Sequence, residues 1–311
     1  MLPCNAAHFV HSRMPGGIIL PVSKPSVYLG TSGFTAAGWV GSFYPAGLKA
    51  ADYLSFYADH FETVEVDSTF YGCPSARTVS GWAAKTPAGF VFSVKVPQSI
   101  THDKALVDCD AELEEFLSTM KILGEKRGPM VLQFPIFDKW KIRDRHEFTD
   151  RLIPFLKKLP SEYRFAIEIR NREWLGAELA DLLREYKVAL VLQDLSYMPK
   201  PMELKFDPIS TDFAYVRWLG DRKEIERQTL SWDKVIVDRT AEMSEWVKYC
   251  YPVVRRGVKV FAYANNHYSG YAPDSVQQFR RLWKVIAGGE IGKPKPAVMS
   301  ASSRQNSFLF E

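Results

Sequence analysis

The stretch 164-RFAIEIRNREWLGAELADLLREYKVALVLQDLS-196 decides the fold. Two short apolar runs, Phe165–Ile169 and Val188–Leu192, flank a segment whose apolar residues recur every three or four positions, at Leu179, Leu182, Leu183 and Tyr186. Nearly continuous apolar runs predict strands covered on both faces, and the recurrence predicts an amphipathic helix. The stretch therefore predicts a strand–helix–strand unit of a parallel sheet in an α/β protein.

This unit recurs along the chain, where eight apolar runs alternate with helical patterns, although the pattern after the sixth run is poorly defined. The runs are Val27–Thr31, Thr63–Val66, Val91–Val96, Met130–Phe134, Phe165–Ile169, Val188–Leu192, Ala214–Trp218 and Val258–Tyr263. Eight units favour a closed (β/α)₈ barrel of the TIM type over an open doubly wound sheet. A GxGxxG turn would support the open sheet, but the first strand leads into Gly30-Thr31-Ser32-Gly33.

The two ends of the chain depart from the pattern. Residues 1–24 hold several Pro and Gly residues and predict a loosely ordered arm. Residues 288–311 are rich in Gly, Lys, Pro and Ser and predict a tail. We therefore expect one barrel domain over residues 25–287.

Composition limits the class of protein. Hydrophobic residues make up 46% and charged residues 24%, an ordinary globular balance, and no apolar stretch reaches the roughly 18 residues of a membrane helix. A net charge of +4 permits an anionic ligand without indicating a strongly basic nucleic-acid-binding face. The scattered Cys4, Cys73, Cys109 and Cys250 fit a reducing compartment without disulfides. We expect a cytoplasmic protein with no membrane partner.

Polar residues fall at the C-terminal ends of the predicted strands, where barrels of this type hold their active sites. All eight strands contribute to this set, which comprises Thr31-Ser32, Glu65, Asp67, Lys95, Gln133, Glu168, Arg170, Gln193-Asp194, Arg217 and Asn265-Asn266-His267. One such residue alone would suggest a structural ion pair, because a buried charge is costly unless it is paired. The set as a whole favours a binding pocket, with a closed network of acids and bases as the alternative.

The residue types indicate acid–base chemistry on an anion. Glu65 and Glu168 are the candidate catalytic residues, because two carboxylates in unlike environments can hold different pKa values. The candidate substrate-binding residues are Lys95, His102, Gln133, Arg170, Arg217 and Asn265. Three strand-end cations against two carboxylates predict an anionic small molecule or phosphate-containing ligand. Asp67 is left out of this balance because the strand can end before it.

We expect neither a cofactor nor a tightly held metal. His102 and His267 are the histidines near strand ends that could join carboxylates around a divalent metal. Lys95 and Arg170 would compete with such a metal for Glu65 and Glu168. The loop over residues 32–47 holds Phe34, Trp39, Phe43 and Tyr44, which cap the barrel or stack on a ligand, and capping is favoured.

The same residues carry a resemblance to a known family. The motifs, in order, are Gly30-Thr31-Ser32-Gly33, Val64-Glu65-Val66-Asp67-Ser68-Thr69-Phe70-Tyr71, Phe92-Ser93-Val94-Lys95-Val96-Pro97, Leu132-Gln133-Phe134-Pro135, Glu168-Ile169-Arg170, Tyr215-Val216-Arg217 and Asn265-Asn266. They resemble the DUF72 (YecE-like) family, which implies a (β/α)₈ barrel. The resemblance supplies no reaction, because the family is named for its unknown function. The family often has Asn in place of Asp67 and a double proline in place of Phe134-Pro135.

Two functions therefore stay open. One is an enzyme with an anion-binding rim, a hydrolase of phosphoester or glycosidic bonds in which Glu65 or Glu168 transfers protons. The other is a noncatalytic protein that binds nucleic acid or an acidic partner through the rim. Replacement of Glu65 by Gln separates them, because it would abolish turnover in the first and spare or strengthen anion binding in the second.

Overall fold

The computed structural model describes residues 26–289 and residue 291, and eight strands of that part form one parallel sheet. The strands are β1 (Val27–Thr31), β2 (Thr63–Val66), β3 (Val91–Lys95), β4 (Arg127–Gln133), β5 (Phe165–Glu168), β6 (Ala189–Leu195), β7 (Phe213–Gly220) and β8 (Lys259–Ala264). Their order in the sheet is β1-β8-β7-β6-β5-β4-β3-β2. Each predicted strand coincides with an observed strand, two of them with the same bounds.

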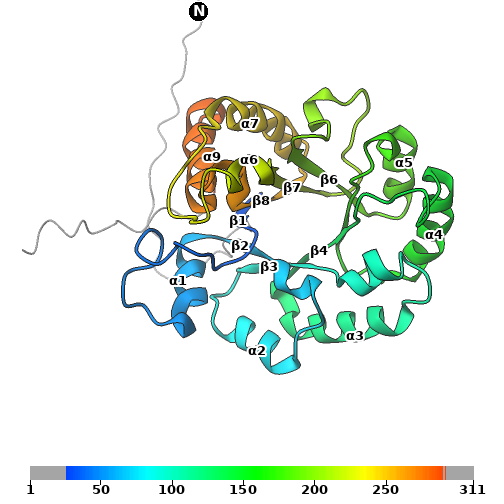
Figure 1. Cartoon of the computed structure of the whole chain (residues 1–311), viewed down its shortest axis with the longest axis horizontal. Coiled ribbons are helices and arrows are strands. Elements are labelled where there is room, and N and C mark those ends of the chain that lie inside the picture. The colour runs from blue at the N-terminus through cyan, green and yellow to red at the C-terminus, as the bar shows by residue number, and fades with distance from the viewer. Residues whose placement is uncertain (1–25, 290, 292–311) are drawn as a thin grey trace, which may run out of the picture.

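Helices surround this sheet, as Figure 1 shows in a view along the barrel. They are α1 (Tyr53–His60), α2 (Ala76–Ala84), α3 (Asp110–Met120), α4 (Arg145–Lys158), α5 (Ala177–Glu185), α6 (Arg222–Glu226), α7 (Thr240–Arg255), α8 (Asn266–Ser269) and α9 (Ala272–Ala287). Short turns of helix are η1 (Ala50–Asp52), η2 (Asp67–Phe70), η3 (Ser99–Asp103), η4 (Lys121–Lys126), η5 (Arg172–Trp174) and η6 (Pro201–Glu203). Between β6 and β7 only η6 forms, which matches the poorly defined pattern there.

The sheet curls into a nearly closed barrel because its edge strands β1 and β2 meet. Ser32 pairs with Glu65 in a parallel bridge, and the Gly33 amide donates a 2.7 Å hydrogen bond to the Glu65 carbonyl. A Cβ atom at Gly30 would lie 2.0 Å from the Thr63 carbonyl oxygen, so only glycine allows this approach of the two strands. The predicted (β/α)₈ barrel is confirmed.

Side chains alternate along each strand between the barrel interior and the helices. The interior cluster is Tyr28, Val131, Ala166, Ala189, Val191, Phe213, Tyr215, Phe261 and Tyr263. A larger cluster between sheet and helices holds the intervening residues, such as Leu29, Val64 and Ile167. Glu168 follows Ala166 by two residues and Arg217 follows Tyr215 by two, so both side chains extend the interior layers toward the C-terminal rim.

Other predictions from the sequence concern parts of the chain outside the rim. In the aromatic loop, Trp39 and Tyr44 are 2% and 1% exposed and pack against each other, and Tyr44 stacks on Tyr53 of α1, so both rings are core residues and not open to a ligand. Cys73, Cys109 and Cys250 are free thiols, whereas Cys4 lies outside the described residues. Among those residues no helix has the length and apolar character to cross a membrane. The predicted arm over residues 1–24 also lies outside them, as does the predicted tail except for residues 288, 289 and 291.

Candidate functional site

Arg217 is the centre of an ion-pair network at the C-terminal rim of the barrel. Its Nη2 and Nε atoms donate to Glu65 Oε1 at 2.8 and 3.1 Å, and its Nη1 atom donates to Glu168 Oε2 at 2.5 Å. All three side chains are at most 3% exposed. Strands β2, β5 and β7 thus bring together three of the residues that the sequence predicted for the site.

Glu65 also accepts hydrogen bonds from two hydroxyl groups. Tyr215 Oη donates to its Oε2 at 2.6 Å, and Ser32 Oγ donates to its Oε1 at 2.8 Å. Sequence reasoning missed Tyr215, which looks like one more core residue of an apolar strand. The alternation of side chains along a strand could have identified it, because Tyr215 precedes Arg217 by two residues and faces the same barrel interior.

Arg170 extends the network outward from Glu168. Its Nε atom donates to Glu168 Oε1 at 2.5 Å, and its Nη1 atom lies 3.5 Å from Tyr197 Oη. Arg170 is therefore paired with a strand-end carboxylate. Glu168 therefore binds one arginine through each of its oxygens, which stabilises its ionised form.

The two buried glutamates have pKa values shifted in opposite directions. Burial alone would raise the pKa of Glu168, but Arg170 and Arg217 outweigh it and hold that pKa at about 2. Burial raises the pKa of Glu65 and Asp67 adds to the rise, against the opposing effects of Arg217, Tyr215 and Ser32. Glu168 is thus fixed as an anion, whereas Glu65 is the carboxylate better suited to accept a proton.

Asp67 corrects the charge balance expected from the sequence. It begins the η2 turn directly after β2, and its Oδ1 atom lies 3.5 Å from Arg217 Nη2. Three carboxylates therefore face three cations, and the expected excess of cations is wrong. The reason is that Asp67 follows Glu65 by two residues and keeps to the same side, although β2 already ends at Val66.

Lys95 stands apart from these pairs. Its side chain comes from the end of β3, and its Nζ atom lies 3.8 Å from the centre of the Phe70 ring. Within residues 26–289 and 291 it makes no ion pair or side-chain hydrogen bond, although the residue is only 9% exposed. Burial lowers the pKa of Lys95, and the positive charge of Arg217 adds to the fall. Lys95 is a cation held in place by an aromatic ring.

The remaining predicted residues divide between the rim and other places. His102 lies against Phe70, with ring centres 4.8 Å apart, and burial together with Lys95 lowers its pKa to about 4. Gln133 pairs in register with Glu168 and donates to the Phe134 carbonyl at 2.7 Å. Asn265 instead caps α8 by accepting from the His267 amide at 3.0 Å, so its side chain has a local structural partner.

Two other strand-end residues have partners outside the Arg217 network. Asp194 accepts from Trp246 Nε1 at 2.7 Å and Tyr268 Oη at 3.2 Å, which directs it toward the helices. His267 contacts Asn265 and lies 3.1 Å from Glu226 Oε1. In the part of the chain that the structure describes, no three His, Cys, Asp or Glu residues are grouped as metal ligands would be.

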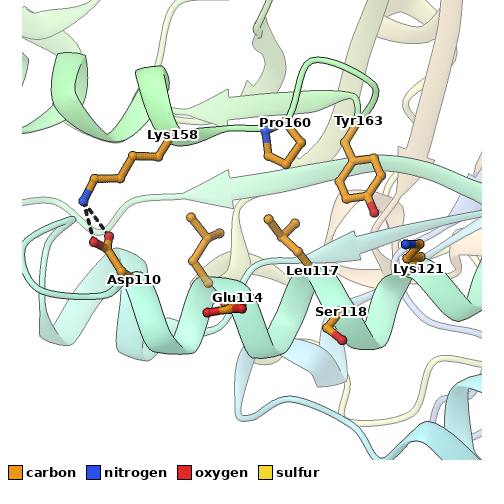
Figure 2. A pocket seen from close by; sticks show the side chains of 9 residues that line it. Asp110, Glu114, Leu117, Ser118, Lys121, Lys158, Pro160 and Tyr163 are labelled. Carbon is orange, nitrogen blue, oxygen red and sulfur yellow. Dashed lines mark hydrogen bonds and ion pairs between the residues drawn. The ribbon is translucent and has the colours of Figure 1, made fainter.

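A pocket on the outer wall of the barrel shares no residue with this network. Figure 2 shows it between α3 and the end of α4, where Leu117, Pro160 and Tyr163 form an apolar part. Lys158 Nζ donates to Asp110 Oδ1 at 2.6 Å across it, so these two charges neutralise each other. The buried ion-pair network therefore lies at the rim and not in this pocket.

Comparison with known proteins gives consistent matches over the barrel. The family model described as protein of unknown function DUF72 matches residues 28–298. The chain is 31% identical to UPF0759 protein YecE of Escherichia coli over 154 residues, which are 48% of this chain and 50% of that protein. The match thus spans about half the length of that relative. UPF0759 protein YunF of Bacillus subtilis is 25% identical over 280 residues, which are 85% of this chain and 96% of YunF.

Solved structures agree with the fold. A DUF72 family protein from Thermotoga maritima has 28% sequence identity and a TM-score of 0.67, with 83% of this chain and 99% of that chain covered. A DUF72 family protein from Enterococcus faecalis has 20% identity and a TM-score of 0.63, with 87% and 99% covered. Neither description names a reaction.

Proposed function

This chain belongs to the DUF72 family of proteins of unknown function, and from that premise we propose that it is a hydrolase that binds a phosphoester at the C-terminal rim of its barrel. The observation that carries the proposal is the ammonium group of Lys95. Of the three strand-end cations, Lys95 is the one without an ion-pair partner among the described residues, whereas Arg170 and Arg217 are held by carboxylates.

A free ammonium in a mostly buried position is costly unless a ligand neutralises it. Phosphate supplies a compact negative charge and several strong acceptor oxygens, which suit a lysine used as a point charge. A phosphoester is favoured over a glycosidic bond because an uncharged sugar would leave Lys95 without an anion. Arg170, 20% exposed in its side chain, borders the same rim and can add a second contact.

The proton-transfer step falls to Glu65 acting through Ser32. A water molecule attacks phosphorus and its oxygen forms the new P–O bond, while the P–O bond to the leaving alcohol breaks. The proton of the water passes to Ser32 Oγ, whose own proton moves along the 2.8 Å hydrogen bond to Glu65 Oε1. The leaving oxygen takes a proton from solvent water and departs as the alcohol, and Glu65 then returns its proton to the solvent. A carboxylate with a raised pKa is a better base, which supports this role for Glu65 over Glu168.

Release of inorganic phosphate from a panel of phosphomonoesters, and release of the alcohol from chromogenic phosphodiesters, tests the proposal. Lys95→Gln should raise KM, and Glu65→Gln should lower kcat by about 10²- to 10⁴-fold, the usual contribution of one acid–base group. Lys248→Gln, on the outer face of α7, is the matched control because its side chain is 58% exposed. Circular dichroism checks that each variant is folded.

Two outcomes would contradict the proposal. Full turnover by Glu65→Gln would show that Glu65 is not the base, although the hydrolase would stand. Tighter anion binding by the same variant, with no turnover in either protein, would favour the noncatalytic binding protein, because a like charge next to the anion has been removed.

A further inference from the structure

The aromatic side chain beside the Lys95 site points to the class of substrate. We infer that the ligand is a nucleoside phosphate whose base stacks on Tyr71 while its phosphate binds Lys95. This inference rests on the proposed function, because it takes Lys95 as the phosphate contact. It adds a recognition element that the strand-end pattern does not contain.

Exposed apolar side chains gather in the segments that follow the C-terminal ends of the strands. Those in such segments are Val40, Tyr71, Val107, Ile136, Trp140, Tyr197, Met202, Leu230 and Val235. The others among the described residues are Ile122, Val285 and Ile286. Because all strands of the sheet run in one direction, these segments lie at the end of the barrel that also carries Lys95, and apolar side chains are available there to pack against a ligand.

Tyr71 is joined to Lys95 through a single intervening ring. The Phe70 ring lies under Lys95 Nζ at 3.8 Å, and its centre is 5.3 Å from that of Tyr71 in an edge-to-face contact. Phe70 also supports His102 at 4.8 Å, so Phe70 fixes one wall of the site. Tyr71 itself is 78% exposed, which leaves most of its ring open for stacking.

This arrangement matches the chemistry of a nucleoside phosphate. Flat heterocyclic bases stack on tyrosine rings with little dependence on sequence, and an ammonium group pairs with phosphate. In the ligand one ribose ring separates base from phosphate, as one phenyl ring separates Tyr71 from Lys95. His102 is neutral near pH 7 because of its lowered pKa, so it offers a ring surface and hydrogen bonds without extra charge.

The adjacent loop offers a second aromatic ring. Lys141 Nζ donates to the Asp103 carbonyl at 2.6 Å, which ties the loop after β4 to the η3 turn that carries His102. That loop carries Trp140, which is 98% exposed. The shared chemistry is therefore a base joined to a phosphate, supplied by a free nucleotide or by a single strand whose next base reaches Trp140.

Isothermal titration of the whole chain with AMP, ribose 5-phosphate and inorganic phosphate tests the inference. AMP should bind roughly 5- to 150-fold more tightly than ribose 5-phosphate, which is the contribution of one stacked base. Tyr71→Ala should remove that difference and leave ribose 5-phosphate binding unchanged, whereas Tyr71→Phe should keep it. Val285→Ala, 81% exposed near the end of α9, is the control for an exposed apolar side chain.

A short single-stranded oligonucleotide distinguishes the two sources. Loss of its affinity in Trp140→Ala, with AMP binding unchanged, would identify a strand, and no loss would identify a free nucleotide. Equal affinities for AMP and ribose 5-phosphate would overturn the inference. The proposed function would still stand if both ligands lost affinity in Lys95→Gln. If none of the phosphate ligands binds, the proposed function itself fails.

Discussion

Glu168→Gln should destabilise the fold by about 3 kcal/mol at neutral pH. The pKa of Glu168 falls from 4.5 to about 2 because two arginines hold its two oxygens. Each pKa unit is about 1.4 kcal/mol of preference for the ionised form, and Gln imitates the protonated form. Since the folded-state pKa is depressed, this stability is complete above the unfolded-state pKa of 4.5 and is lost as the pH falls toward 2.

Urea unfolding followed by tryptophan fluorescence, at pH values from 7 down to 3, measures this difference. The gap between wild type and Glu168→Gln should narrow steadily below pH 4.5. Glu178→Gln is the control, because that carboxylate pairs with Arg145 but is 74% exposed and should change stability little. A gap that stays the same at pH 3 and pH 7 would refute the electrostatic reasoning.

Three further variants test other parts of the structure. Lys95→Gln should leave the free energy of unfolding unchanged or raise it, because burial already lowers the pKa of the ammonium group, which has no ion-pair partner in the described part of the chain. A loss of more than about 1 kcal/mol in urea unfolding would contradict this expectation. Tyr215→Phe removes the 2.6 Å hydrogen bond to Glu65, so the pKa of Glu65 should rise further and shift the pH–activity profile to higher pH. An unchanged profile would show that this hydrogen bond does not affect the catalytic group. Gly30→Ala brings a Cβ atom within 2.0 Å of the Thr63 carbonyl, so a wild-type Tm in calorimetry would contradict the observed closure of the barrel.

The barrel was predictable because its signals are local. Apolar runs such as Val27–Thr31 and Thr63–Val66 are strands with the predicted bounds, since a strand covered on both faces needs apolar side chains at nearly every position. The helical stripe from Leu179 to Tyr186 likewise matches α5. The position of the polar residues at one rim followed from the same pattern, because all strands of the sheet run in one direction.

The pairing within the rim was decided by the tertiary structure. The sequence alone determined that Glu65, Glu168 and Arg217 lie at strand ends, but only the barrel brings β2 and β5 to the two sides of β7's arginine. Asp67 joins them because it begins η2 within 3.5 Å of Arg217, and Tyr215 joins them because the interior holds its hydroxyl against Glu65. Lys95 alone is left unpaired among these charges. Electrostatic energy depends on distance and burial in three dimensions, so residue types and spacing give the members of such a network but not its contacts.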